Sequence, residues 1–264
     1  MLVSDIEAML FSVFPRDLAE PWDRVGLSVG DPSAGVTGVA CALDPLPDTL
    51  ARAAAQGCNV LVTHHPAFLE APGTVTPSVA TSSLGGSLVW EAARLGVSLI
   101  AMHTNLDRSA AALAVPTRLT NLHAVGRLEE PDGFGAVLDG EGLTAAELAE
   151  RFGEAYGCPP TLYGDPDAPC TRVGFCSGSL GDLWETAVAQ GCQAVVTGEL
   201  GYHRVLAAVE AGCAVILLGH DVSELPYARL LAASVAERQD SVPVVTLAEQ
   251  AHWRICLDPR SIGR

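Results

Sequence analysis

Histidine and carboxylate residues gather at four points of the sequence, each directly after a short apolar run. The pair His64 and His65 follows NVLVT, and similar clusters follow VSLIAM, QAVVT and AVILL. These later clusters contain His103, Asn105 and Asp107, then Glu199 and His203, then His220, Asp221 and Glu224. Imidazole and carboxylate ligands without a nearby cysteine suit Zn, Fe, Mn, Co or Ni. The residue types therefore indicate a metal site.

The adjacent histidines indicate more than one ion. Neighbouring side chains of a regular strand point to opposite faces. Because Pro66 ends the strand, we expect His64 and His65 on a loop, where each imidazole can serve a different ion. Dinuclear sites hold their ions roughly 3.5–4 Å apart, usually with a bridging carboxylate or water. Asp107 and Glu224 are the candidate carboxylates.

A strand-to-helix turn is expected between His220 and Glu224. Ser223 is a plausible N-cap of the helix that follows, and Pro226 is tolerated in a first helical turn. This arrangement would keep the imidazole of His220 and the carboxylate of Glu224 close together at the end of the strand.

The apolar runs that precede these clusters belong to an internal repeat. AQGCNVLVTHHP aligns with AQGCQAVVTGEL, and GVSLIAMHTNLD aligns with GCAVILLGHDVSE, which has one extra residue. The S/T-x-x-E pattern of a capping box occurs at Ser4 with Glu7 and again at Thr144 with Glu147. Matching segments in the same order favour the duplication of one unit.

Each copy alternates short β-rich runs with Ala-rich amphipathic stretches. This alternation predicts an α/β fold in which helices pack on a largely parallel sheet. We therefore expect two similar α/β lobes, residues 1–126 and 127–264, divided near Gly126. Ligands of open α/β sheets bind at the carboxyl ends of the strands, which is where the clusters fall.

Composition excludes several classes of function. The net charge of −16 argues against nucleic acid as the main partner, because phosphates would be repelled. All 15 basic residues are arginine, so Schiff-base and P-loop lysine chemistry are excluded. No apolar run approaches the roughly 18 residues of a membrane span, and the first residues lack the basic stretch of a signal peptide. We expect a cytoplasmic protein without a membrane partner.

Three further residues have simpler interpretations. GFCSG resembles a nucleophile elbow around Cys176, but the repeat makes this segment an ordinary strand. His123 and His252 belong to no cluster, so we expect them to be structural.

Five motifs together resemble the Nif3-like dinuclear metal-centre proteins, also called GTP cyclohydrolase 1 type 2 homologues: WDRVGLSVGD, VTHHP, HTNLD, TGELGYH and GHDVSE. The resemblance implies a homohexameric toroid of two-domain α/β subunits, with two divalent metal ions in a cleft between the lobes. Carried over residue by residue, it implies metal ligands at His64, His65, Asp107, His220 and Glu224. It also implies that His103, Glu199 and His203 lie nearby, supporting the ligands or facing the substrate.

Two functions are consistent with these features. The first is a metal-dependent hydrolase of a nucleotide or phosphoester, in which His103, Glu199 or His203 moves protons. Cyclohydrolase action on GTP is implied by the resemblance alone. The second is a non-catalytic metal-binding scaffold or regulator of toroidal assembly, which metal-dependent turnover would distinguish from the first.

Overall fold

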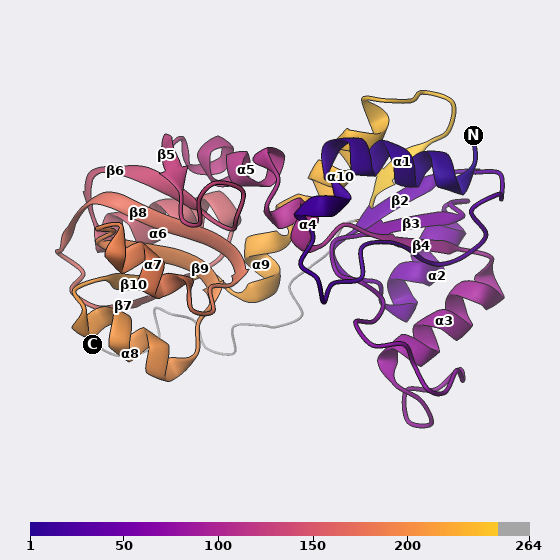
Figure 1. The fold of residues 1–264 in the computed structure, drawn as a ribbon, viewed down its shortest axis with the longest axis horizontal. Helices are drawn as coiled ribbons and strands as arrows, with labels where there is room; N and C mark the ends of the chain where they lie inside the picture. Colours follow the sequence, from indigo (N-terminus) through magenta and orange to yellow (C-terminus); the bar gives the residue numbers. More distant parts are fainter. Residues whose placement is uncertain (248–264) are drawn as a thin grey trace.

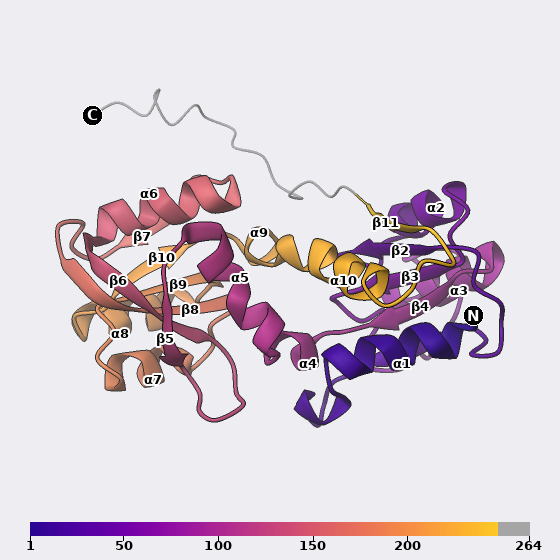
Figure 2. The same ribbon diagram turned by 90° about the horizontal axis from the view of Figure 1, so that it is seen from above.

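The computed structural model describes residues 1–247 and has two lobes, each built on one β-sheet with helices packed against it (Figure 1, Figure 2). The first sheet has five strands in the order β1-β4-β3-β2-β11, and the second has six in the order β5-β6-β8-β9-β10-β7. The strands are β1 (Gly26–Val29), β2 (Val39–Ala42), β3 (Val60–Thr63), β4 (Ser98–Ala101), β5 (Ala124–Arg127), β6 (Ala136–Thr144), β7 (Thr161–Tyr163), β8 (Pro169–Ser179), β9 (Ala194–Glu199), β10 (Ala214–Leu217) and β11 (Val244–Thr246). This two-lobed α/β architecture confirms the predicted fold class.

The two sheets share a parallel unit of three strands. In the first sheet β2, β3 and β4 are neighbours and run parallel. In the second sheet β8, β9 and β10 do the same. The first sheet is completed by β1, antiparallel to β4, and by β11, parallel to β2. The second is completed by antiparallel pairs of β7 with β10, β6 with β8 and β5 with β6. The shared unit is the structural counterpart of the sequence repeat.

Helices cover both faces of each sheet, because successive strand side chains point to opposite faces. In the first lobe, Val39 and Cys41 of β2 pack in a core with α1 and α10, whereas Ala40 and Ala42 pack in a core with α2 and α3. The helices are α1 (Val3–Val13), η1 (Arg16–Leu18), α2 (Pro47–Ala55), α3 (Leu84–Leu95), α4 (Thr104–Asp107), α5 (Ala110–Thr120), α6 (Ala145–Tyr156), α7 (Leu183–Ala189), α8 (Tyr202–Glu210), α9 (His220–Glu224) and α10 (Pro226–Ala236). Among residues 1–247, no helix is long and apolar enough to cross a membrane.

The chain passes from the first lobe to the second and then returns. The predicted boundary at Gly126 lies in β5, which pairs with β6 in the second sheet. After α9, helix α10 packs beside α1 through Leu231 and Val235, and β11 joins β2 in the first sheet (Figure 1). The predicted division into residues 1–126 and 127–264 did not anticipate this return.

The two predicted capping boxes have different outcomes. Thr144 and Glu147 form the predicted box at the start of α6, where the hydroxyl of Thr144 accepts the N–H of Glu147 at 3.2 Å. The Ser4–Glu7 box is wrong, because α1 begins one residue before Ser4. Glu7 instead accepts a hydrogen bond from the N–H of Leu27 at 2.8 Å.

Candidate metal centre

The predicted metal ligands meet at the junction of the lobes, near α4 and α9 (Figure 1). His64 and His65 directly follow β3, and Asp107 ends the short helix α4 that follows β4. His220 and Glu224 are the first and last residues of α9, which follows β10. Three strand ends from two sheets therefore bring together five residues that lie up to 160 positions apart in the sequence (224 minus 64).

Glu224 lies at the centre of this group. Its Oε1 atom lies 3.5 Å from Nε2 of His64, and its Oε2 atom lies 3.1 Å from Nε2 of His65 and 3.3 Å from Nε2 of His220. Asp107 contacts the same cluster through His64, with 3.7 Å between Oδ1 and Nε2. Ligand atoms converge in three sets: His64–His65–His103, and two further sets, His65–His220–Glu224 and His64–Asp107–Glu224, which share only Glu224.

The three histidines of the two sets that share Glu224 are oriented in the same way. In each, Nδ1 is held by an acceptor, so that Nε2 faces the cluster. The acceptors are the Met102 carbonyl at 3.0 Å for His64, Asp44 at 2.7 Å for His65 and Glu199 at 3.1 Å for His220. Because a carbonyl can only accept, Nδ1 of His64 donates this hydrogen bond, and Nε2 is left to face the cluster. This is how proteins orient histidines that bind metals.

Three buried polar atoms in the cluster have ion-pair contacts but no hydrogen bond within the described chain. Nε2 of His64, Oδ1 of Asp107 and Oε2 of Glu224 make no hydrogen bond to any part of the chain that the structure describes. The side chain of His64 is 0 % exposed and that of Glu224 is 5 % exposed. Buried polar groups without partners are costly, and a cation among them would remove that cost. Nitrogen and oxygen donors in this number fit a divalent transition metal.

Without a metal ion, protonated imidazoles supply the positive charge of the site. Burial lowers the pKa of His65, but the contacts with Asp44 and Glu224 outweigh burial and raise it to about 10. The contact with Glu224 raises the pKa of His220 to about 9, and Glu199 adds to the effect. The neighbouring carboxylates therefore stabilise positive charge at the positions where the imidazole nitrogens converge.

The two carboxylates respond in opposite directions. Burial raises the pKa of Asp107 to about 7, against the attraction of His64. Burial would also raise the pKa of Glu224, but His64 and His220 hold it well below its usual range. Glu224, at the centre of the cluster, therefore has the lower pKa of the two and loses its proton more readily than Asp107.

A cleft of about 830 Å³ opens beside the cluster, and Asp107, His220 and Glu224 are part of its wall. His103 also lines this cleft, and its Nδ1 lies 2.9 Å from Oδ1 of Asp23. The cleft falls in the size range of small-molecule sites. It gives a ligand access to the metal cluster.

The structure separates the other predicted residues. Glu199 contacts His220 and is 58 % exposed, so its carboxylate supports a ligand from outside. His203 is exposed at the start of α8, with its ring against Tyr202, and it does not line the cleft within the described chain. His123 is exposed outside the cluster, and His252 lies outside the described residues.

Cys176 has the ordinary role in a strand that the repeat predicted. It lies inside β8 rather than at a strand-to-helix turn. Its side chain is buried, and burial raises the pKa of its thiol. A buried thiol of this kind is not an activated nucleophile.

Ser223 differs from its predicted role. It is not an N-cap, because Gly219 precedes α9 with a φ of 101°. The hydroxyl of Ser223 instead accepts a hydrogen bond from the N–H of Gly178 at 2.8 Å and donates to the carbonyl of His220 at 2.8 Å. Pro226 lies in the first turn of α10 as expected. Ser223 therefore ties α9 to the end of β8.

Several residues that support the site were missed from the sequence. Asp44 follows β2 and could have been found by the same strand-end rule that identified the histidines. Asp23 belongs to the WDRVGL motif and holds both His103 and the N–H of Thr104. Tyr227 gave no signal; its ring lies 4.9 Å from that of His64.

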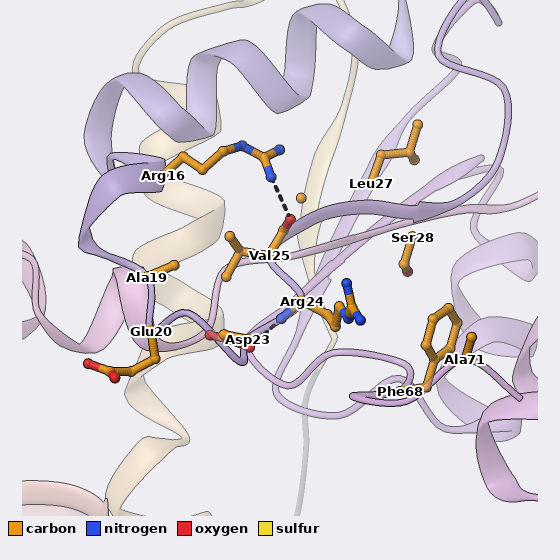
Figure 3. A pocket seen from close by; sticks show the side chains of 11 residues that line it. Arg16, Ala19, Glu20, Asp23, Arg24, Val25, Leu27, Ser28, Phe68 and Ala71 are labelled. Carbon is orange, nitrogen blue, oxygen red and sulfur yellow. Dashed lines mark hydrogen bonds between the residues drawn. The ribbon is translucent and has the colours of Figure 1, made fainter.

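A separate pocket of about 540 Å³ lies beneath α1 and shares Glu20 with the cleft (Figure 3). Arg16 and Arg24 are on its wall, and the guanidinium of Arg16 donates to the carbonyl of Val25 at 3.2 Å. Figure 3 shows that the carboxylate of Glu20 points away from both guanidinium groups. The arginines of this region therefore face a different space from the metal cluster.

Two named proteins are similar to this chain over most of its length. A GTP cyclohydrolase 1 type 2 homolog of Streptomyces coelicolor is 32 % identical over 253 residues, which cover 90 % of this chain and 87 % of the relative. A protein with the same name from Clostridium acetobutylicum is 30 % identical and covers 85 % of both chains.

Solved structures show the same fold at lower identity. A Staphylococcus aureus hypothetical protein superposes with a TM-score of 0.87 at 20 % identity, covering 97 % of this chain and 99 % of that one. A Bacillus cereus protein related to NIF3 gives a TM-score of 0.86 at 15 % identity, with the same coverage. The sequence model of Duf34/NIF3 (NGG1p interacting factor 3) matches residues 1–252, and the chain therefore belongs to this family.

Proposed function

We propose that the protein binds two divalent metal ions and uses them to hydrolyse a nucleotide or phosphoester. The observation that carries this proposal is Glu224, whose carboxylate is shared by two sets of converging ligand atoms. His65 and His220 would hold one ion, and His64 and Asp107 the other, with Glu224 between them. The names of the relatives suggest GTP cyclohydrolase chemistry, which we treat as one candidate reaction within this class.

Bound divalent ions would supply Lewis-acid polarisation of the scissile group and an activated water. The chain provides the rest. His103 faces the cleft and is held by Asp23, so it is placed to donate a proton to the leaving group. Glu199 orients His220 from the rim of the site. His203 lies outside the cleft, and we assign it no step.

Metal-dependent turnover tests this proposal. The purified protein is stripped with a chelator, reloaded with Zn, Mn, Fe, Co or Ni, and assayed on GTP and on bis(p-nitrophenyl) phosphate. We expect turnover that returns with a metal and is lost in His64→Ala. His123→Ala is the matched control, because His123 is exposed outside the cluster.

Each result has a distinct meaning. Turnover that survives in His64→Ala, or that is independent of metal, would contradict the proposal. Tight binding of metal without turnover of any substrate would favour the alternative of a metal-binding scaffold or regulator.

We also propose that subunits assemble as a homohexamer in the cytoplasm. Large exposed apolar side chains are concentrated on α3 and the segment before it; they are Leu69, Val75, Val79, Leu84 and Trp90. Concentrated apolar surface is typical of a contact between subunits. Multi-angle light scattering should give six times the mass of one chain, and a monomer would contradict the assembly.

A further inference from the structure

The wall of the cleft beside the metal cluster is acidic. Its carboxylates are Glu20, Asp107, Glu129, Asp182, Glu185 and Glu224, and the lining contains no arginine within the described chain. Asp107 and Glu224 belong to the metal set. The other four carboxylates would remain negative around a metal-loaded site unless other groups offset them.

Arginines offset only two of these four. Glu20 pairs with Arg108 at 3.0 Å, and Asp182 pairs with an arginine of α8. Within the described residues, the carboxylate of Glu129 accepts only the backbone N–H of Phe134, at 3.1 Å. The carboxylate of Glu185 has no hydrogen bond or ion pair within residues 1–247, although its backbone N–H donates to the Asp182 carbonyl at 3.1 Å. Two exposed carboxylates on the wall are therefore without a cationic partner.

The guanidinium of Arg108, which lies 5.6 Å from the centre of the Phe134 ring on the cleft wall, is engaged by Glu20 and by the Asp132 carbonyl. Arg16 and Arg24 line the separate pocket of Figure 3, where Arg16 is also paired with Glu7 at 3.3 Å. A nucleoside triphosphate would bring a large negative charge next to Glu129 and Glu185. Like charges at a binding surface disfavour such a partner.

An aromatic ring adds a second feature that favours a cation. Trp22 lines the same cleft and is 55 % exposed, and its ring lies 6.0 Å from that of His103. Exposed indole faces attract organic cations, and quaternary ammonium groups in particular. Glu224, whose buried Oε2 atom contacts His65 and His220 but accepts no hydrogen bond within the described chain, lines the same cleft. The metal cluster and the acidic wall thus form one continuous site.

We propose that this cleft recognises a positively charged organic group, so that the substrate is a phosphoester whose alcohol carries an ammonium or similar cation. The hydrolytic part rests on the proposed function, whereas the recognition part does not. The phosphoryl group would bind the metal ions, and the cation would lie against Trp22, Glu129 and Glu185. In the reaction, oxygen of water bonds to phosphorus, the phosphorus–oxygen ester bond breaks, and the alcohol leaves with a proton.

The test compares two ligands of the same shape. Phosphorylcholine carries a quaternary nitrogen, and neohexyl phosphate carries a carbon in its place. Calorimetry on the Zn²⁺-loaded protein should show phosphorylcholine binding about tenfold more tightly, because only it completes the cationic contacts. The double variant Glu129→Gln with Glu185→Gln should lose this preference. Glu150→Gln with Glu210→Gln should keep it, since these exposed residues change the net charge equally and do not line the cleft.

Equal binding of the two ligands by the wild type would overturn the proposal. So would a preference that survives in the Glu129–Glu185 double variant, or tighter binding of GTP than of phosphorylcholine. Release of inorganic phosphate from phosphorylcholine is followed in parallel and reports on hydrolysis alone. Preference in binding without release would contradict the proposed hydrolase and support the recognition, and release without preference would do the opposite.

Discussion

The two copies of the repeat make unequal contributions to the metal centre. After its second parallel strand, the first copy has His64 and His65, whereas the aligned positions of the second copy are Gly198 and Glu199. After the third strand, both copies place a histidine four residues before a carboxylate on a short helix. A duplicated frame therefore holds a site whose ligands are only partly duplicated.

Two features explain this difference between the copies: the lack of space for a side chain at Gly198, and the side chain of Glu224, which is one methylene longer than that of Asp107. A Cβ atom at Gly198 would lie 2.5 Å from the Gly178 carbonyl and 2.8 Å from Cα of His220, so no histidine fits there. Glu224 contacts both histidines of the other lobe, whereas the shorter Asp107 contacts only His64. The second copy thus supplies the carboxylate that joins the lobes, and the first copy supplies the adjacent imidazoles of His64 and His65.

The largest expected effect comes from the paired carboxylates. Glu224→Gln should weaken the binding of both ions by about 100-fold or more, because it removes the shared ligand, while Asp107→Asn should weaken only one. Competition with a chromophoric chelator measures both affinities. Equal loss in the two variants would show that the carboxylates play symmetric roles.

Affinity should also fall steeply with acid. The raised pKa values of His65, about 10, and His220, about 9, mean that both rings are protonated in the metal-free protein at pH 8. A metal must displace these protons, so affinity should fall roughly 100-fold per pH unit between pH 8 and 7. Titration in weak buffer with an indicator should show about two protons released. Affinity that is independent of pH would contradict this account of the apo site.

The carboxylates that orient the histidine ligands should differ between the two copies in their effect on metal affinity. Asp44→Asn should weaken metal binding by roughly 10–100-fold, because Asp44 orients the half-buried His65 at 2.7 Å. Glu199→Gln should have a smaller effect, since Glu199 is 58 % exposed and water can replace it. The same chelator competition ranks the two variants, and the reverse order would show that exposure is not what separates them.

The lack of space for a side chain at Gly198 can be tested by adding a single methyl group there. Gly198→Ala should lower the free energy of unfolding by about 1–3 kcal/mol through overpacking against Gly178 and His220. Gly201→Ala is the control, because a Cβ there meets nothing within 4 Å. Chemical denaturation of the metal-free protein measures both. Equal stability would remove the steric explanation for the difference between the copies.

Much of the site could be predicted because its residues follow a topological rule. Parallel strands in one sheet end at the same edge, so the clusters after β3, β4, β9 and β10 could be located from sequence alone. The rule does not predict which side chains of each cluster point toward the metal site. Glu199 and His203 follow β9, yet one supports His220 from the rim and the other is exposed on α8.

The rest depends on contacts that sequence spacing does not encode. The return of α10 and β11 to the first sheet follows from apolar packing against α1, and no motif marked it. Ser4 and Ser223 both have local capping patterns, but tertiary contacts at Leu27 and Gly178 decided where the neighbouring hydrogen bonds go. Local sequence patterns therefore predicted the presence of helices and strands better than the residues at which they begin and end.

The central claim is that two ions share Glu224. Elemental analysis combined with X-ray absorption spectroscopy on the metal-loaded wild type tests it most directly. We predict close to two ions per subunit and a metal–metal distance of roughly 3.5–4 Å. A single ion per subunit, or two ions without a metal–metal signal in that range, would contradict the shared carboxylate.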